Sequence, residues 1–284
     1  MFLSIFDIFK IGIGPSSSHT MGPMGAAGKF LDQLLKHKIK AVSLSASLHG
    51  SLAFTGKGHH TDYATIMGLI GFKPQTFNSN IAQQALDEVS QTGKIQPEGH
   101  SEYLFNPNTA IRFDFEKSLD GHPNGMIFYA YDSIGTVLFE ETYYSVGGGF
   151  VQTASELASG ISYSKLENTT PYPFKNASEM LEMCVSTGKS IAELKSENEQ
   201  ANISKSDLSQ GINKIWDVMN NCIEEGLKKE GILPGGLFVK RRAKGIHESL
   251  RKEQRRNIAP PHIINDWMSC YAMAVNEQNA AGAQ

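Results

Sequence analysis

The chain has 284 residues, 40% of them hydrophobic and 19% charged, which is the balance of a folded protein with one or two domains. Its formal net charge of −3 provides no overall field that would favour nucleic acid or an anionic membrane. The longest apolar runs fall far short of the roughly 20 residues that span a bilayer. Asp7 and Lys10 interrupt the apolar start, unlike a signal peptide, so we expect a cytoplasmic protein.

The three cysteines, Cys184, Cys222 and Cys270, are odd in number and widely spaced, which argues against a disulfide framework. The sequence contains no C-x-x-C pair, so it encodes neither a zinc ribbon nor a ferredoxin-type cluster site. Cys222 falls on an apolar helical stripe and is most simply a buried core thiol.

The stretch from Gly14 to Thr20 reads GPSSSHT and precedes a segment, residues 21–35, that is predicted to be helical. Glycine and proline stop regular structure, and the serines, histidine and threonine bring hydroxyls and an imidazole into one turn. A helix that begins here leaves its first N–H groups without intrahelical partners, and such groups suit a carboxylate or phosphate. The alternative is a serine-rich helix cap that contacts no ligand.

The first half of the chain is predicted to be an α+β domain. Alternating apolar and polar residues predict strands over residues 42–48, 111–116, 126–131 and 137–144, the last two forming a hairpin. Helices are predicted over residues 63–70, capped by Thr61 or Asp62, and 81–91, ended by Gly93. Hairpin-linked strands indicate a partly antiparallel sheet with helices on one face.

The strand pattern disappears after the Pro171–Pro173 segment, where we place a domain boundary. Residues 177–187 are predicted to be helical, and Ser190 and Glu193 form a capping-box pattern. Apolar residues at helical spacing predict further helices over residues 212–227 and 264–275. An all-α segment over residues 172–284 is therefore expected to follow an α+β domain over residues 1–165.

Four predicted loops are rich in Gly, Ser, His and Asn: residues 14–20, 56–62, 121–125 and 145–149. Loops on a rigid sheet commonly carry sites, and their convergence would create a small polar pocket for an anionic or zwitterionic molecule. The pocket would contain His19, Lys57, His59, His60, His122 and Asn124. Each histidine taken alone is more simply a turn residue that bonds local backbone.

Other site types fit the sequence poorly. The spacing from Gly50 to Gly58 does not match a P-loop, and no G-x-S-x-G nucleophile elbow accompanies the glycines at 147–149. Adjacent His59 and His60 would point to opposite faces of an extended segment and would rarely share a metal. The basic residues between 240 and 256 form either an anion-binding patch or, more simply, a solvated face without interleaved aromatic residues.

The residues resemble the iron–sulfur-dependent L-serine dehydratases, or L-serine ammonia-lyases, of the single-chain type. The resemblance covers essentially the whole chain. Its motifs are GIGPSSSHT at 12–20 with GPM at 22–24, GSL at 50–52, TGKGH at 55–59 with TD at 61–62, HPNGM at 122–126, YYSVGGGF at 143–150, PYPF at 171–174, GILPG at 231–235, RRA at 241–243, AVNE at 274–277 and NAAG at 279–282.

The resemblance implies a β domain of the substrate-binding type, over residues 1–165, followed by a helical catalytic domain that holds a 4Fe–4S cluster. Such enzymes deaminate L-serine to pyruvate and ammonia without pyridoxal phosphate, with a cluster iron acting as Lewis acid. By this resemblance His59, His19 and Lys57 would be catalytic, with His59 handling the proton. The implied substrate-binding residues are Ser16, Ser17, Ser18, Thr20, His122, Asn124, Ser145, Gly147 and Gly148.

The family's cluster cysteines lie further along the helical domain, beyond the end of this sequence, and Cys184, Cys222 and Cys270 do not occupy those positions. We therefore expect no metal ligands within this chain, a truncated α domain over residues 172–284, and little activity from the chain alone. The alternatives are a non-catalytic serine-binding or regulatory module and one half of a split enzyme. Possible partners besides L-serine are the missing C-terminal half and a homodimer partner, but neither nucleic acid nor a membrane.

Overall fold

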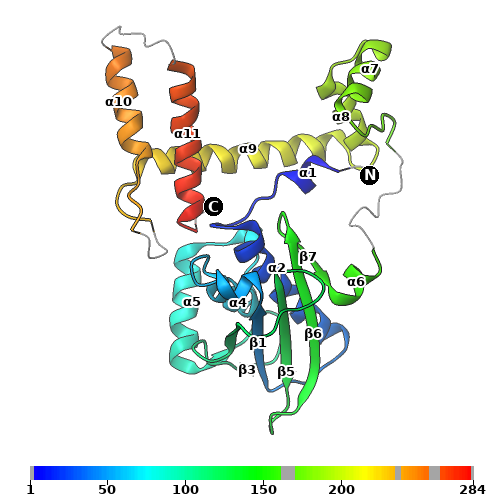
Figure 1. The fold of residues 1–284 in the computed structure, drawn as a ribbon, viewed down its shortest axis with the longest axis vertical. Coiled ribbons are helices and arrows are strands. Elements are labelled where there is room, and N and C mark those ends of the chain that lie inside the picture. Colours follow the sequence, from blue (N-terminus) through cyan, green and yellow to red (C-terminus); the bar gives the residue numbers. More distant parts are fainter. Residues whose placement is uncertain (1–2, 161–169, 234–237, 256–262, 283–284) are drawn as a thin grey trace. The chain divides into compact units, whose positions relative to one another are not determined.

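The computed structural model describes residues 3–160, 170–233, 238–255 and 263–282, and it contains two compact units (Figure 1). One unit combines residues 1–10 with residues 160–218, and the other combines residues 11–159 with residues 219–284. The predicted fold class is confirmed: an N-terminal mixed sheet with helices precedes a helical segment. The domain division at residues 165 and 172 stays a prediction, and residue 165 lies outside the described residues.

The sheet belongs to the larger unit and has seven strands in a mixed arrangement. Its order is β2 (Lys94–Ile95), β3 (Tyr103–Leu104), β1 (Ser43–His49), β5 (Gly125–Tyr131), β6 (Val137–Gly147) and β7 (Phe150–Thr153), with β4 (Ile111–Asp114) also paired to β1. Strand β1 runs parallel to β3 and β4 but antiparallel to β5. The predicted hairpin is confirmed, because β5 and β6 pair antiparallel around the turn at Asp132.

The core lies between this sheet and helix α2 (Gly22–Lys36), with helix α4 (Thr61–Ile70) packed on α2. Phe30 of α2 is fully buried, and its ring stacks 5.3 Å from the ring of Phe128 on β5. The remaining helices around the sheet are η1 (Ser17–Met21), α3 (Ser51–Phe54), η2 (Pro74–Thr76), α5 (Ser79–Thr92) and α6 (Ala154–Ala158). Gly93, in the left-handed conformation, ends α5 as predicted.

The expected start of α4 was wrong by two residues. The helix begins at Thr61, and its N-cap is His60 with φ 53°, so neither Thr61 nor Asp62 provides the cap. Thr61 is fully buried, and the carboxylate of Asp62 instead accepts from Lys57 Nζ at 2.6 Å. The left-handed residue reverses the chain immediately before the helix, a conformation that apolar periodicity does not reveal.

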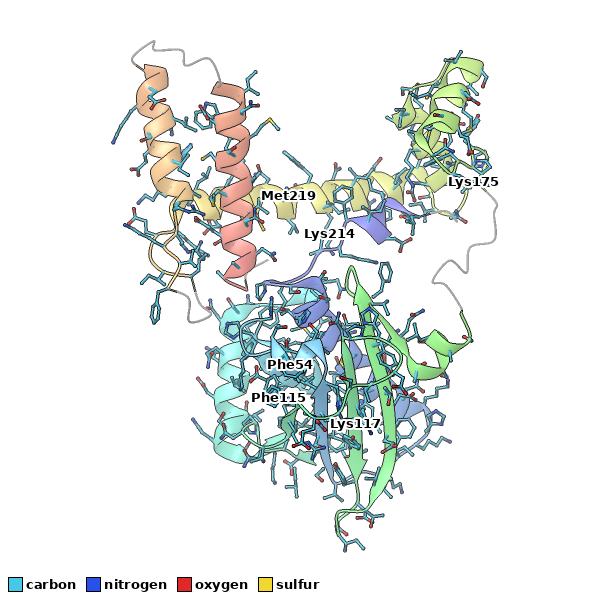
Figure 2. All side chains as sticks on the ribbon, in the orientation of Figure 1. Phe54, Phe115, Lys117, Lys175, Lys214 and Met219 are labelled. Carbon is cyan, nitrogen blue, oxygen red and sulfur yellow. The ribbon has the colours of Figure 1, made fainter. Side chains whose placement is uncertain are left out.

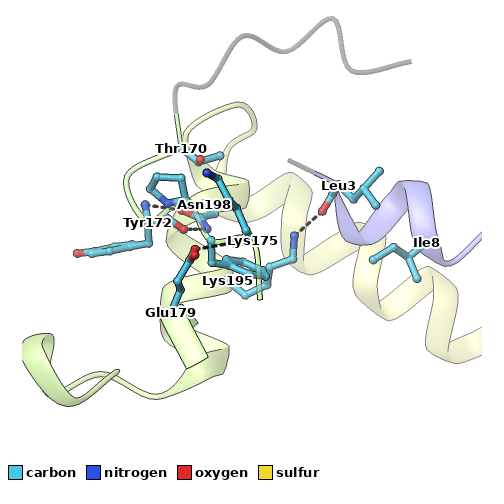
Figure 3. A pocket seen from close by; sticks show the side chains of 10 residues that line it. Leu3, Ile8, Thr170, Tyr172, Lys175, Glu179, Lys195 and Asn198 are labelled. Carbon is cyan, nitrogen blue, oxygen red and sulfur yellow. Dashed lines mark hydrogen bonds between the residues drawn. The ribbon is translucent and has the colours of Figure 1, made fainter. Parts of the chain in front are cut away.

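The smaller unit is held together by two buried polar side chains of helix α8 (Ile191–Gln200). Glu199 accepts hydrogen bonds from the N–H of Ile5 in α1 (Ile5–Ile8), at 2.7 Å, and from Lys195 Nζ, at 2.9 Å. The Asn198 side chain bonds both the N–H and the C=O of Tyr172 (Figure 3). Beside these contacts lies a pocket of about 500 Å³, and the predicted capping box at the start of α8 is present.

Helix α7 (Ala177–Thr187) matches its predicted bounds, and α9 (Lys205–Lys228) and α11 (Ile263–Ala280) extend beyond theirs. Helix α10 (Ala243–Arg255), which the hydrophobic pattern did not predict, packs against α11. Gly226 allows α9 and α11 to approach closely, because a Cβ there would overlap the Ala274 carbonyl. None of the helices in the described part of the chain has the length and apolar character needed to cross a membrane.

The contact between α2 and α4 can be tested with a pair of glycine variants. A Cβ at Gly68 of α4 would overlap the Met24 carbonyl and lie 2.6 Å from Ala27 Cβ, whereas a Cβ at Gly28 of α2 has open space. We expect Gly68→Ala to lower the free energy of unfolding by about 1–3 kcal/mol, through overpacking. Gly28→Ala should raise it by about 0.5–1 kcal/mol, through helix propensity. Urea unfolding measures both, and equal stability of the two variants would contradict this packing.

Candidate active site

Ser51, the first residue of α3, joins two of the predicted loops. Its N–H donates to the Pro123 carbonyl at 2.8 Å, and its hydroxyl lies 2.9 Å from His19 Nε2. The preceding Gly50 has φ 54°, and a Cβ at that position would overlap the Pro123 carbonyl. Glycine is therefore required for the chain to turn from β1 directly into α3 beside residues 121–125.

Asn124 and Ser145 join two further loops. The Ser145 N–H donates to the Asn124 carbonyl at 3.0 Å, and the Asn124 side-chain amide donates to the Ser145 carbonyl at 3.1 Å. The Ser145 hydroxyl is sealed against Gly22, where a Cβ would overlap it. The four predicted loops thus lie together, joined by the adjoining residues 21–22 and 50–55, and we call residues 14–22, 50–62, 121–125 and 145–149 the loop cluster.

His19 uses both ring nitrogens within the loop cluster. Nδ1 lies 2.8 Å from the Ser18 hydroxyl, and Nε2 lies 2.9 Å from the Ser51 hydroxyl. Burial, followed by the positive charge that a protonated His59 would carry, lowers the pKa of His19, and the contact with Ser51 opposes this shift. A neutral ring fixed by two hydroxyls suits a positioning role better than proton transfer.

His59 differs from His19 in having one nitrogen available. Its Nδ1 lies 2.9 Å from the Thr55 carbonyl, which can only accept, so Nδ1 must carry the proton. Nε2 of the neutral ring is then an acceptor, and it has no hydrogen-bond partner among the described residues. The ring lies 4.8 Å from the His19 ring, centroid to centroid, and the His59 carbonyl accepts from Thr20 Oγ1 at 3.0 Å. His59 therefore has the geometry of a general base.

The serine turn forms the helix cap that was the alternative in the sequence analysis. The N–H groups of Ser17 and Ser18 nevertheless make no intrahelical hydrogen bond. Ser16 is the N-cap, and its hydroxyl accepts from the His19 N–H at 3.2 Å. Ser17 is exposed, and Thr20 is buried with its hydroxyl also accepting from the Ser16 N–H. A cap and an anion site are compatible here, because helix geometry leaves the N–H groups of the first turn without intrahelical acceptors.

Two other predicted residues have partners of different kinds. Lys57 has a side chain that is 75% exposed, and its ammonium contacts Asp62 at 2.6 Å and lies over the Phe113 ring at 4.8 Å. Neither partner belongs to the histidine pair, so the structure turns Lys57 outward. His122 Nδ1 accepts from the Asn124 N–H at 3.1 Å, which makes His122 a brace for the Asn124 turn.

The glycines after Ser145 form an irregular reversal between β6 and β7. Gly147 and Gly148 have φ 100° and φ 58°, and the register of the pair shifts between Ser145 and Gly147. Gly149 lies against the Met21 side chain, so the reversal closes over the start of α2. Left-handed backbone at consecutive positions favours glycine strongly, and it leaves main-chain N–H groups at the rim of the loop cluster.

Comparison with known proteins supplies the family. The model for the serine dehydratase beta chain matches residues 4–156, and the model for the serine dehydratase alpha chain matches residues 186–284. The chain belongs to the serine dehydratase family. It is 41% identical over 287 aligned positions to L-serine dehydratase of Streptomyces coelicolor, and 41% identical over 285 to L-serine dehydratase TdcG of Escherichia coli. The alignments cover 100% and 99% of this chain but only 62% of each relative's length.

The cysteines do not form the cluster site that serine dehydratases imply. Cys184 lies in the smaller unit, whereas Cys222 and Cys270 lie in the larger one. Cys270 is fully buried and donates to the Ala243 carbonyl, and burial raises the pKa of both Cys222 and Cys270, which disfavours the thiolate that binds iron. Within the described ranges no three His, Cys, Asp or Glu side chains gather as metal ligands, so these residues do not fit an iron–sulfur cluster.

Sequence reasoning did not single out Ser51 and Gly22, which the structure places in the loop cluster. Ser51 could have been found, because the GSL motif at 50–52 was among the quoted resemblances. Gly22 shows no signal beyond its place in GPM, since its role is the space it leaves for Ser145. The apolar alternation placed Phe54 and Phe115 on apolar strand faces, but in the structure they are 68% and 56% exposed, and their rings lie edge to face at 5.5 Å (Figure 2).

Two buried serines, Ser47 on β1 and Ser145 on β6, test which buried hydroxyls are hydrogen-bonded. The Ser145 hydroxyl has no hydrogen-bond partner among the described residues, whereas the Ser47 hydroxyl lies 2.8 Å from Nε2 of the buried His49. We expect Ser47→Ala to cost about 1–3 kcal/mol, since it leaves that nitrogen unsatisfied. Ser145→Ala should be neutral or slightly stabilising in the ligand-free chain. Thermal unfolding compares them, and a larger loss for Ser145→Ala would show that its hydroxyl is bonded.

The lowered pKa of His19 predicts the direction of a pH effect on stability. An unfolded histidine titrates near pH 6.5, so between that pH and the lower folded pKa the unfolded chain binds more protons. Stability should therefore be fully present above about pH 6.5 and fall as the pH is lowered. His19→Gln should flatten this slope but not abolish it, because burial also lowers the pKa of His100. Urea unfolding at several pH values measures the slope, and an unchanged slope in the variant would exclude His19 as a source.

Proposed function

We propose that this chain acts in the deamination of L-serine to pyruvate and ammonia, with the loop cluster as its serine-binding site. Relatives that share 41% of its residues are named L-serine dehydratases, but the chain spans 62% of their length. The support from the structure is the convergence of the four loops, three of which carry histidines. The proposal depends on a single observation: both ring nitrogens of His19 are bonded to hydroxyls, whereas His59 keeps one ring nitrogen available as an acceptor.

The serine carboxylate would be held by the N–H groups of Ser17 and Ser18, which the first helical turn leaves without acceptors. The amine would face Asn124. Since the Asn124 amide nitrogen is committed to the Ser145 carbonyl, its oxygen is the side that can accept from the substrate. His19, fixed between Ser18 and Ser51, would keep the turn and the next loop in register.

His59 would remove the α-proton of serine through Nε2, with the Nδ1 proton held by the Thr55 carbonyl. Loss of that proton together with the β-hydroxyl releases water and leaves 2-aminoacrylate. This tautomerises to the imine, which takes up one water and gives pyruvate and ammonia. The ligand set for an iron–sulfur cluster is not formed by the described residues, so no step here is assigned to one.

Adjacent histidines provide a matched pair of variants. The His59 ring lies beside the His19 ring, whereas His60 lines a pocket of about 330 Å³ with Tyr63 and Gln83, on the side of the loop cluster that Gly14, Pro15 and Thr20 border. We expect His59→Asn to lower the rate at which L-serine exchanges its α-proton with solvent deuterium by about 10²-fold or more, while L-serine affinity changes little. His60→Asn should stay close to wild type.

Calorimetric titration with L-serine, and with D-serine as control, separates binding from chemistry. Binding of L-serine without pyruvate would support the site and assign the chain a binding role alone. Absence of L-serine binding to the folded wild-type chain would overturn the proposed site. Equal losses of α-proton exchange in the two histidine variants would overturn the role of His59 while leaving the binding site intact.

A further inference from the structure

A basic pocket lies in the helical segment of the larger unit, formed by residues outside the loop cluster. Its volume is about 910 Å³, and it is bordered by the loop that precedes α10 and by faces of α10 and α11. Its charged lining residues are Lys240, Arg241, Arg242, Lys244, Glu230 and Asp266. Ser249 and Ser269 add hydroxyl donors to the same lining.

Only one of the four cations in this lining has a carboxylate partner among the described residues. Lys244 Nζ contacts Glu230 at 2.6 Å. Arg241 instead donates to the side-chain carbonyl of Gln278 at 3.2 Å, and Gln278 is 1% exposed. Arg242 has only Met273 Sδ, at 3.4 Å, as a weak acceptor. Arg241 is thus fixed by a buried amide without an ion pair, and the guanidinium of Arg242 is exposed and has no carboxylate partner among the described residues.

The helix terminus beside the pocket does not provide the binding groups. The N–H groups of Arg242 and Ala243, at the start of α10, both donate to Glu277, a carboxylate that is 3% exposed. A ligand would therefore be held by side chains. The hydrogen bond from Lys244, and then the charges of Lys244 and Lys240, lower the pKa of Glu230, which is consistent with a positive field at this rim.

We propose that this pocket binds a small multivalent anion, either a phosphate-bearing molecule or a polycarboxylate. Guanidinium groups bind both classes through paired N–H donors, and the serine hydroxyls can complete their coordination. A monovalent anion would gain little from several separated cations. A purely solvated basic face, the simpler interpretation of residues 240–256, would not require a hollow or the bond from Arg241 to the buried Gln278.

The same helix provides a matched control. Arg251 and Lys252 are exposed and do not line the pocket, and they are flanked by Glu248 and Glu253. Removal of the two positive charges at Lys240 and Arg242 should weaken the binding of a ligand in the pocket. Removal of the two at Arg251 and Lys252 should change only the overall electrostatic potential. The proposal does not depend on L-serine binding or turnover.

Titration calorimetry of the full chain with pyrophosphate, citrate and acetate at constant ionic strength tests the proposal. We expect pyrophosphate or citrate to bind at least tenfold more tightly than acetate, and the better of the two identifies the ligand class. Lys240→Gln/Arg242→Gln should lower that affinity at least tenfold, and Arg251→Gln/Lys252→Gln less than threefold. Equal losses in the two pairs, or no preference over acetate, would overturn the site.

A loss of fold must be distinguished from a loss of binding. The charge-conserving pair Lys240→Arg/Arg242→Lys should retain more affinity than Lys240→Gln/Arg242→Gln, and circular dichroism should show wild-type helix content for each variant. In NMR spectra of the wild-type chain, pyrophosphate should change the amide chemical shifts mainly of the residues that line the pocket. Shifts spread evenly over basic residues, Arg251 and Lys252 included, would show nonspecific ion binding and would also overturn the site.

Discussion

The double contact of Ser51 is the constraint on which the candidate site depends. Its main chain is bonded to Pro123 and its hydroxyl to His19, so one residue fixes three loops at once. The register of the sheet makes this possible. Leu48 pairs with Met126, and Gly125 pairs with Tyr144. The end of β1, the start of β5 and the last part of β6 therefore lie at the same end of the sheet. The loops at that end meet because the strands are paired this way.

Hydrogen bonding gives the two neighbouring histidines different chemistry. His19 has a hydroxyl at each nitrogen, and a hydroxyl can donate or accept, so the ring is satisfied as a neutral group. His59 has a carbonyl at one nitrogen, which fixes its tautomer and leaves the other as an acceptor. Because the rings lie 4.8 Å apart, a charge on His59 would disfavour a charge on His19, which adds to the effect of burial on the pKa of His19.

The sequence was sufficient to predict elements with strong periodicity and loops with distinctive composition. The alternation over 42–48 identified β1, and clustered Gly, Ser, His and Asn identified the four loops that converge. Strands β2 and β3 have two residues each, too few for any period to show. The outward turn of Lys57 arises from its contact with Asp62, and α4 begins early because His60 is left-handed. Both depend on local backbone geometry that residue type alone leaves open.

The turn at residues 14–20 also depends on the far end of the chain. Asn279, in the last turn of α11, packs on Gly14 so closely that a Cβ there would overlap both its carbonyl and its side-chain oxygen. The same helix end carries Glu277, which receives the first N–H groups of α10, and Gln278, which holds Arg241. Three consecutive residues therefore connect the serine turn with the basic pocket. Because Asn279 of α11 packs on Gly14, a displacement of the end of α11 would also displace Gly14, which directly precedes Pro15 and the serines.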